Sequence, residues 1–291
     1  MARITRFSIA KEDIESQFET FEKRIFTKRD ISRIFYEGRA GWRLPKSMTV
    51  DNFIEKMTQK TKLTRVPLPF GNRPLERFIY GDISSYELAM CLTSNAYFSH
   101  YTALYLHQLT EQISKTIYVT YEQSKKSFEQ NLTQENIDRA FKKPQRLSQN
   151  NITYKDNVIF LLNGKFTDLA GVITASYMTE DDIKVTSLER TLIDIVVRPS
   201  YSGGIFEILK AYEQARDRKI SINKLGAILK RMDFIYPYEQ AIGFLLEKAG
   251  YRESQINIFK KDFFRYDFYL TYGMKEIEYS NKWRLFYPKG F

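Results

Sequence analysis

The sequence predicts an α+β protein in which an N-terminal winged helix-turn-helix, residues 1–80, precedes a larger mixed α+β domain, residues 81–291. Three helical patterns followed by two extended stretches indicate the first domain. Interspersed helix and strand patterns indicate the second. At roughly 150 residues per domain, the length of 291 residues predicts about two domains. With 43% apolar and 27% charged residues, the composition is typical of a folded globular chain.

Apolar spacing and capping residues predict the first two helices. Ser8 is placed to cap a helix whose apolar positions recur every three or four residues: Ile14, Phe18, Phe21 and Ile25. Thr27 begins the second helix, because its hydroxyl can accept a hydrogen bond from the backbone N–H of Asp30. Asp30 also lies favourably in the positive first turn. Gly38 and Gly41 then break the helix.

A third helix and a hairpin complete the predicted N-terminal domain. Ser47 or Thr49 introduces the helix, whose buried stripe has the spacing i, i+3, i+4, i+7: Val50, Phe53, Ile54 and Met57. Residues 62–66 and 76–80 are predicted strands. The tip between them is rich in turn residues: Pro67, Pro69, Gly71, Asn72 and Pro74. Three helices followed by a hairpin is the element order of a winged helix-turn-helix.

The larger domain combines both kinds of element. Helices are predicted at 86–92 and 99–109, from Thr133 to Phe141, and after Gly204, Ser221 and Pro237. Thr186 and Glu189 have capping-box spacing before another helix, which must end by Pro199. Strands are predicted around residue 152 and at 116–120, 158–162 and 172–176. The tail from 256 to 287 alternates aromatic and polar residues, which predicts antiparallel strands.

Positive charge is concentrated in the first quarter of the chain. The whole chain has 45 Lys and Arg against 35 Asp and Glu, a net charge of +10. Residues 1–80 hold 17 basic and 10 acidic side chains, and residues 24–80 alone hold 13 and 5. A basic region beside a nearly balanced one predicts a polyanion-binding module joined to a domain with another task. The alternative is random scatter of charge in a lysine-rich sequence.

Duplex DNA is the predicted polyanion, because phosphate neutralisation requires Lys and Arg spread over a rigid shape. On the third helix, polar side chains could reach base edges in the major groove: Thr49, Asn52, Lys56 and Gln59. Asp51 and Glu55 repel phosphate, so the whole helix face cannot lie on a DNA backbone; a solvated face is the alternative. The predicted DNA-binding residues are Lys28, Arg29, Arg43, Lys46, Thr49, Asn52, Lys56, Lys60, Lys62, Arg65, Arg73 and Arg77.

No resident cofactor or metal is expected. His100 and His107 are seven residues apart, which places them about 10 Å apart along a helix, too far to share one metal ion without further ligands. Cys91 is the single cysteine and lies in a predicted helix, where a thiol packs. The chain therefore has no intramolecular disulfide, which agrees with a reducing cytoplasm. Charge near the start interrupts any signal peptide, and no apolar stretch is long enough to span a membrane.

One acidic set offers an enzymatic alternative. Asp168, Asp182 and Lys184 follow, loosely, the D…(D/E)xK order of metal-dependent nucleases. Two carboxylates could hold Mg²⁺ while the lysine polarises a water. Such spacings are common by chance, and residues 180–182 have the composition of a solvated turn. We therefore expect a protein that is not an enzyme.

Four stretches resemble motifs of the AbiEi family of antitoxins. They are SHYTALYLHQLT at 99–110 followed by IYV at 117–119, VTSLERTLID at 185–194, YPYEQAIGFLLEKAGY at 236–251 and WRLFYP at 283–288. The SLERTLID-like stretch is followed by Arg198-Pro199 and a YxGG segment at 201–204. Together these cover most of residues 95–288. The N-terminal part is similar only in layout, with IFTKRDI at 25–31 as the entry to the second helix, and the hairpin lacks the RGxY ending typical of the family.

This resemblance implies the antitoxin of a type IV toxin–antitoxin system, active in phage defence. In that family the winged helix binds inverted repeats at the operon's own promoter and represses transcription. The C-terminal domain counteracts a toxin that resembles a nucleotidyltransferase, and direct contact with the toxin is not the expected mode. The alternatives are a transcription regulator of another operon and a metal-dependent phage-defence nuclease.

Overall fold

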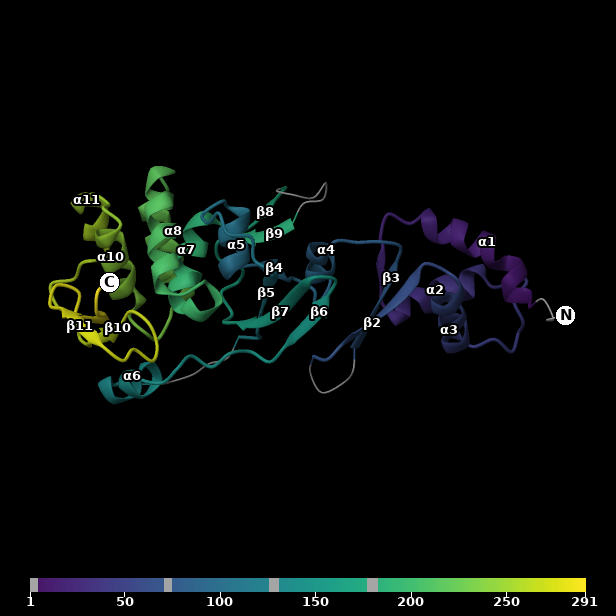
Figure 1. Cartoon of the computed structure of the whole chain (residues 1–291), viewed down its shortest axis with the longest axis horizontal. Helices are drawn as coiled ribbons and strands as arrows, with labels where there is room; N and C mark the ends of the chain where they lie inside the picture. Colours follow the sequence, from purple (N-terminus) through teal and green to yellow (C-terminus); the bar gives the residue numbers. More distant parts are fainter. Residues whose placement is uncertain (1–4, 71–74, 126–130, 177–182) are drawn as a thin grey trace. The chain divides into compact units, whose positions relative to one another are not determined.

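The computed structural model describes residues 5–70, 75–125, 131–176 and 183–291, and the chain forms two compact units, 1–92 and 93–291 (Figure 1). The predicted mixed α+β class is confirmed, since helices accompany three β-sheets. The division falls twelve residues after the boundary expected at residue 80. Residues 81–92 belong to the first unit, where the Arg77 side chain donates hydrogen bonds to the carbonyls of Cys91 and Leu92. None of the described helices is both long and apolar enough to cross a membrane.

The N-terminal unit consists of four helices and one small sheet in its described residues. The elements are α1 (Arg6–Glu19), β1 (Ile25–Phe26), α2 (Lys28–Gly38), α3 (Val50–Lys60), β2 (Leu63–Leu68), β3 (Leu75–Tyr80) and α4 (Ser85–Met90). The strand order is β1-β3-β2, and both pairings are antiparallel. Pro67 lies in β2, an edge strand, where the missing backbone N–H removes no necessary hydrogen bond.

Local capping residues explain where these helices begin. Thr27 caps α2 and Thr49 caps α3, each accepting a hydrogen bond from a backbone N–H three residues on, as expected. The predicted cap of the first helix was wrong, because Thr5 and not Ser8 accepts the capping bond. Ile25 was also misplaced, since α1 ends at Glu19 and Ile25 pairs with Ile79 in the sheet.

The α2 cap gives the N-terminal unit a measurable dependence on pH. Burial alone would raise the Asp30 pKa, but hydrogen bonds from the Thr27 backbone and from Lys23 outweigh it and lower this pKa from 3.8 to about 2. A carboxyl whose pKa is lower in the folded state than in the unfolded state stabilises the fold fully at pH values above its unfolded-state pKa. This stabilisation is lost as the pH falls through the folded-state pKa.

We therefore expect Asp30→Asn to lower the free energy of unfolding by about 1–2 kcal/mol at pH 7 and by almost nothing near pH 2. The value at pH 7 is smaller than the full pKa shift would give, because Lys23 is exposed and solvent screens its charge. Urea unfolding of 5-fluorotryptophan-labelled protein measures this, since Trp42 and Trp283 place one fluorine in each unit. A cost that stays the same at all pH values would contradict the assignment.

The C-terminal unit is built on a six-stranded sheet with the order β6-β7-β5-β4-β9-β8. Its elements begin with β4 (Tyr97–Phe98), α5 (His100–Leu106), β5 (Thr116–Glu122), α6 (Gln134–Phe141), β6 (Asn151–Tyr154), β7 (Asn157–Gly164), β8 (Val172–Ala175) and β9 (Ile183–Thr186). They continue with α7 (Leu188–Val197), η1 (Pro199–Tyr201), α8 (Ile205–Asp217), α9 (Ile222–Met232), α10 (Tyr238–Lys248), α11 (Glu253–Ile256), η2 (Asn257–Phe259), β10 (Phe268–Tyr269), β11 (Ile277–Ser280) and β12 (Leu285–Pro288).

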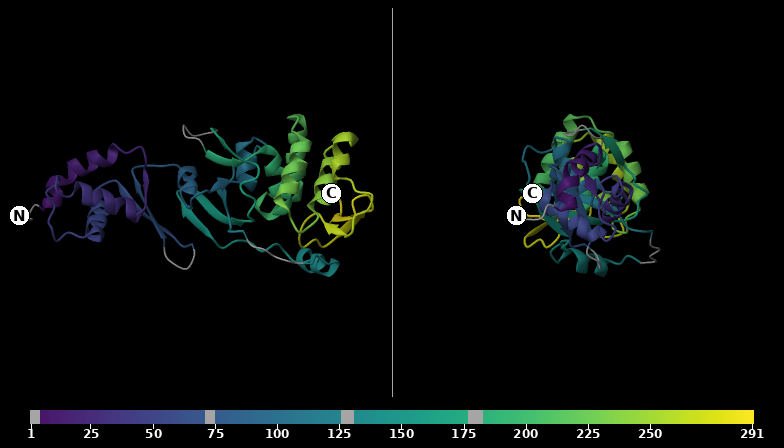
Figure 2. Two further views of the ribbon diagram at one scale, coloured as in Figure 1. Left: turned by 180° about the vertical axis from the view of Figure 1, so that it is seen from behind. Right: turned by 90° about the vertical axis from the view of Figure 1, so that its right-hand side faces the viewer.

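Helix α7 is the centre of the C-terminal core. It contacts α5, α8, α9 and α10, and it lies between the sheet and the α8–α10 pair in Figure 1, an order that the left view of Figure 2 shows from behind. Its residues 189–196 are all buried, including the ion pair that Arg190 Nε and Asp194 Oδ1 form at 2.8 Å. The SLERTLID-like stretch thus forms a core helix, in which Arg190 and Asp194 pair at the spacing i, i+4.

Three further local expectations were wrong, two in the C-terminal unit and one at the end of the N-terminal unit. Ser187, not Thr186, caps α7, because the Thr186 hydroxyl lies 2.8 Å from the hydroxyl of Thr191 instead. The tail begins with α11 and η2, and β10 pairs with β12 in parallel, so it is not simply antiparallel. Cys91, expected inside a helix, is the exposed C-cap of α4, although partial burial of its thiol raises its pKa.

Candidate functional site

Helix α3 presents a polar stripe on one face. Thr49, Asn52, Lys56 and Gln59 recur with the spacing three, four, three, which places them on the same side of the helix. On the other side, Phe53 is fully buried and packs against the rings of Phe35 and Trp42, with centroids 5.0 and 5.8 Å away. Because the buried side fixes α3 against α2, the polar stripe is held on a rigid support.

The two acidic residues of α3 lie beside this stripe and have local partners. Lys28 Nζ lies 2.5 Å from Asp51 Oδ1, so the start of α2 neutralises the start of α3. Glu55 Oε1 accepts a hydrogen bond of 3.2 Å from the Gln59 amide. Lys28, a predicted DNA contact, therefore has a second task, which is to reduce the repulsion that Asp51 would exert on phosphate.

The predicted cations divide by what their side chains contact. Four are exposed or half-buried and have no ion pair or side-chain hydrogen bond among the described residues: Arg29, Arg43, Lys46 and Lys56. Within the described part of the chain, the polar contact of Lys60 is with the hydroxyl of Ser8, at 3.3 Å. Lys62 pairs with Glu19 at 3.1 Å, and Arg65 pairs with Glu76 on the neighbouring strand. The first five cations are the ones whose full charge is available to a polyanion.

Two residues predicted to contact DNA, Arg77 and Arg73, are not among these available cations. Arg77 donates hydrogen bonds to the carbonyls of Glu76, Cys91 and Leu92, so its guanidinium fastens β3 to the end of α4. Those carbonyls lie up to fifteen residues away in the sequence, which is why residue type alone suggested a phosphate contact. Arg73, at the hairpin tip, lies outside the described residues.

Asp168 and Lys184, two of the three residues of the possible nuclease site, contact different partners in the structure. Asp168 forms an exposed ion pair with Arg231 at 3.0 Å, and Lys184 lies 3.4 Å from the side-chain oxygen of Asn95. Asp182 lies outside the described residues. Within the described ranges, no group of three His, Cys, Asp or Glu side chains could hold a metal ion.

Both histidines are buried and take part in packing. His100 Nδ1 lies 2.8 Å from the Ser99 hydroxyl, and burial lowers the pKa of His100 well below its usual value. His107 Nε2 lies 2.6 Å from the carbonyl oxygen of Thr186 and donates to it. Burial also lowers the His107 pKa, so both rings are neutral near pH 7.

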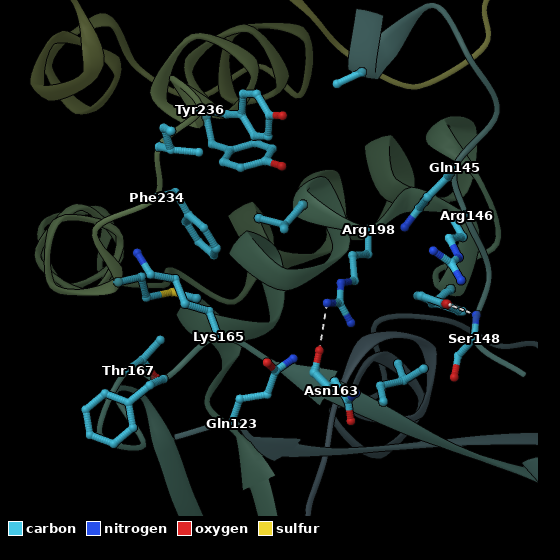
Figure 3. Close-up of a pocket in the computed structure, with 18 of the residues that line it drawn as sticks. Gln123, Gln145, Arg146, Ser148, Asn163, Lys165, Thr167, Arg198, Phe234 and Tyr236 are labelled. Atoms are coloured by element: carbon cyan, nitrogen blue, oxygen red, sulfur yellow. Dashed lines mark hydrogen bonds between the residues drawn. The ribbon is translucent and has the colours of Figure 1, made fainter. Parts of the chain in front are cut away.

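The C-terminal unit contains a cleft of about 1460 Å³ that the sequence analysis did not identify (Figure 3). Its walls come from the ends of β5 and β7, the segment after α6, the end of α7 and the segment after α9. Seven basic side chains line it, against two acidic ones: Lys125, Arg139, Lys143, Arg146, Lys165, Arg198 and Arg231, with Asp168 and Asp233. The clustering of basic residues between 139 and 146 was the available sequence signal.

The fold resembles a known structure. The chain is similar to the RV2827C protein from Mycobacterium tuberculosis, whose crystal structure matches with a TM-score of 0.62 over 96% of this chain and 91% of that chain. The two sequences are 12% identical, so the likeness concerns the fold alone. No protein-family model and no curated protein matches the sequence.

Proposed function

We propose that the chain is a type IV antitoxin and transcriptional autorepressor, not an enzyme. In this proposal the N-terminal unit is a winged helix-turn-helix that binds inverted repeats in the chain's own promoter. The C-terminal unit counteracts a cognate nucleotidyltransferase-like toxin. The element order α1-β1-α2-α3-β2-β3 with the sheet order β1-β3-β2 supports the first part. The four motif-like stretches between 99 and 288 support the second.

The observation that carries the DNA-binding proposal is the α3 stripe and the cations around it. Asn52 and Lys56 extend from a helix that is anchored by its buried side, as major-groove recognition requires. Arg29, Arg43 and Lys46 lie on α2 and on the segment that leads to α3, with their charges available for phosphates. The charge of Asp51 beside the stripe is locally compensated by Lys28.

Asn52→Ala is expected to relax sequence preference at one base-pair position of the operator. An asparagine that reads an adenine through two hydrogen bonds contributes about 1–3 kcal/mol of discrimination. Competition binding with operator duplexes that differ at single positions measures this. The same loss of affinity for every duplex, with unchanged preference, would assign Asn52 to the backbone instead.

The complete proposal is tested by co-expression with the product of the neighbouring gene, which the proposal expects to be nucleotidyltransferase-like, together with a reporter under the chain's own promoter. The full chain should repress the reporter and protect the cells. Lys56→Gln with Lys60→Gln should lose repression and keep protection, because both lie in the N-terminal unit. Repression without any protection would favour a regulator of another operon. A Mg²⁺-dependent cleavage activity that Lys184→Ala abolishes would favour the nuclease.

A further inference from the structure

We propose that the basic cleft of the C-terminal unit binds single-stranded nucleic acid, with bases stacked on Phe234 and Tyr236 and phosphates held by the cations opposite. This inference is independent of operator binding, because every residue that lines the cleft belongs to the C-terminal unit. Positively charged grooves that carry aromatic side chains are the general means of holding unpaired strands.

The two walls of the cleft differ in chemistry. Phe234 and Tyr236 lie on one side, Gln145, Arg146 and Ser148 lie on the other, and Arg198 lies between them (Figure 3). An unpaired nucleotide presents an aromatic face and an anionic backbone on different sides. The arrangement of the walls therefore fits a stacked base on one side and its phosphate on the other.

The aromatic wall is held in place by its own packing. The Tyr236 ring meets Phe141 edge-on at 5.1 Å, and Phe234 meets Tyr238 edge-on at 5.2 Å. Phe234 and Tyr236 nevertheless remain only half-buried. Lys165 lies over the Phe234 ring, 5.6 Å from its centre. Because the rings are oriented before any ligand arrives, little rotational entropy is lost on stacking.

The opposite wall is anchored as well. The Ser148 backbone N–H donates to the Tyr201 hydroxyl at 2.7 Å, and the Gln145 side-chain oxygen accepts from the Ser200 N–H at 3.1 Å. These bonds hold the segment after α6 beside η1. Lys143 and Arg146 on this segment are exposed and have no ion pair or side-chain hydrogen bond among the described residues, so their charges are available to a phosphate.

The volume of the cleft favours an oligonucleotide over a small molecule as its ligand. Pockets for drug-sized ligands hold roughly 300–1,000 Å³, and this cleft exceeds that range at about 1460 Å³. Seven cations also line this cleft, against two acidic side chains, which favours a ligand that carries several negative charges. Several linked nucleotides match both the volume and the charge.

Fluorescence anisotropy of the full chain with labelled oligo-rU and oligo-dT tests the proposal, with excess unlabelled duplex present to occupy the N-terminal unit. Tyr236→Leu and Arg146→Gln are each expected to weaken binding roughly tenfold, the order expected for one stacked base or one paired phosphate. The matched controls Phe263→Leu and Lys219→Gln, both outside the cleft and exposed, should bind as the wild type does. The two oligonucleotides distinguish RNA from DNA as the source of the strand.

Binding that neither cleft variant weakens would overturn the proposal, and so would the absence of binding by the full chain. Poly-glutamate that displaces the oligonucleotide equally well at equal charge would also overturn it and would indicate a site for an acidic protein. Arg146 is exposed, so its variant is expected to fold; an unaltered thermal transition verifies this for both variants.

Discussion

Replacing Arg190 with methionine is expected to lower the free energy of unfolding of the C-terminal unit by about 3–5 kcal/mol. The Arg190 and Asp194 side chains are only 4% and 8% exposed, and they pair at 2.8 Å in the middle of the core helix α7. Burial lowers the pKa of Arg190, but the Asp194 carboxylate beside it more than offsets this, so the arginine stays charged. Methionine fills a similar volume and leaves the Asp194 charge buried without its partner.

The matched control is Arg231→Met. Arg231 also pairs with an aspartate, Asp168, at 3.0 Å, but both side chains are more than half exposed. Loss of such a pair costs about 0–1 kcal/mol. Urea unfolding followed by the fluorine signal of Trp283 compares the two variants. Equal costs for both would show that burial does not control the energy of the Arg190–Asp194 pair.

Neutralising the available cations of the N-terminal unit is expected to have the largest effect on DNA binding. If five phosphates are contacted, log K falls with log salt at a slope of about −4.5, which is roughly a 500-fold loss between 50 and 200 mM salt. The five-fold glutamine variant should have a slope near zero and weak affinity at low salt. The substituted residues are Arg29, Arg43, Lys46, Lys56 and Lys60.

A second five-fold variant controls for net charge. It replaces exposed lysines of the C-terminal unit with glutamine: Lys115, Lys210, Lys219, Lys230 and Lys275. It removes the same charge from the chain and should keep most of the salt slope. If both variants lose the slope to the same extent, DNA attraction follows total charge and not the N-terminal surface.

Local patterns predicted the helix starts well, because a cap depends on residues three positions apart. Thr27 forms the expected hydrogen bond with the N–H of Asp30. Thr133, where a helix was predicted to begin, caps α6 by accepting from the N–H of Asn136. The two-residue strand β1 was missed, since Ile25 lies in it only because it pairs with Ile79 across the unit. Helical spacing could not reveal that pairing.

Candidate site residues were predictable where one helix carries them and not where the fold assembles them. The α3 stripe repeats at helical spacing, so the sequence indicated it. The cleft joins side chains from Gln123 to Tyr272, and its aromatic and basic walls come from segments about ninety residues apart. The hydrogen bonds of Arg77 could not be predicted for the same reason, because its acceptor carbonyls are brought near only by the packing of α4.

Hydroxyl-radical footprinting of the chain's own promoter tests the central proposal most directly. Protection is expected at both halves of an inverted repeat, with centres about one or a whole number of helical turns apart. Lys56→Gln with Asn52→Ala should abolish this protection. Uniform weak protection along the promoter, or a footprint that the α3 variant leaves unchanged, would contradict the assignment of the N-terminal unit as the operator-binding module.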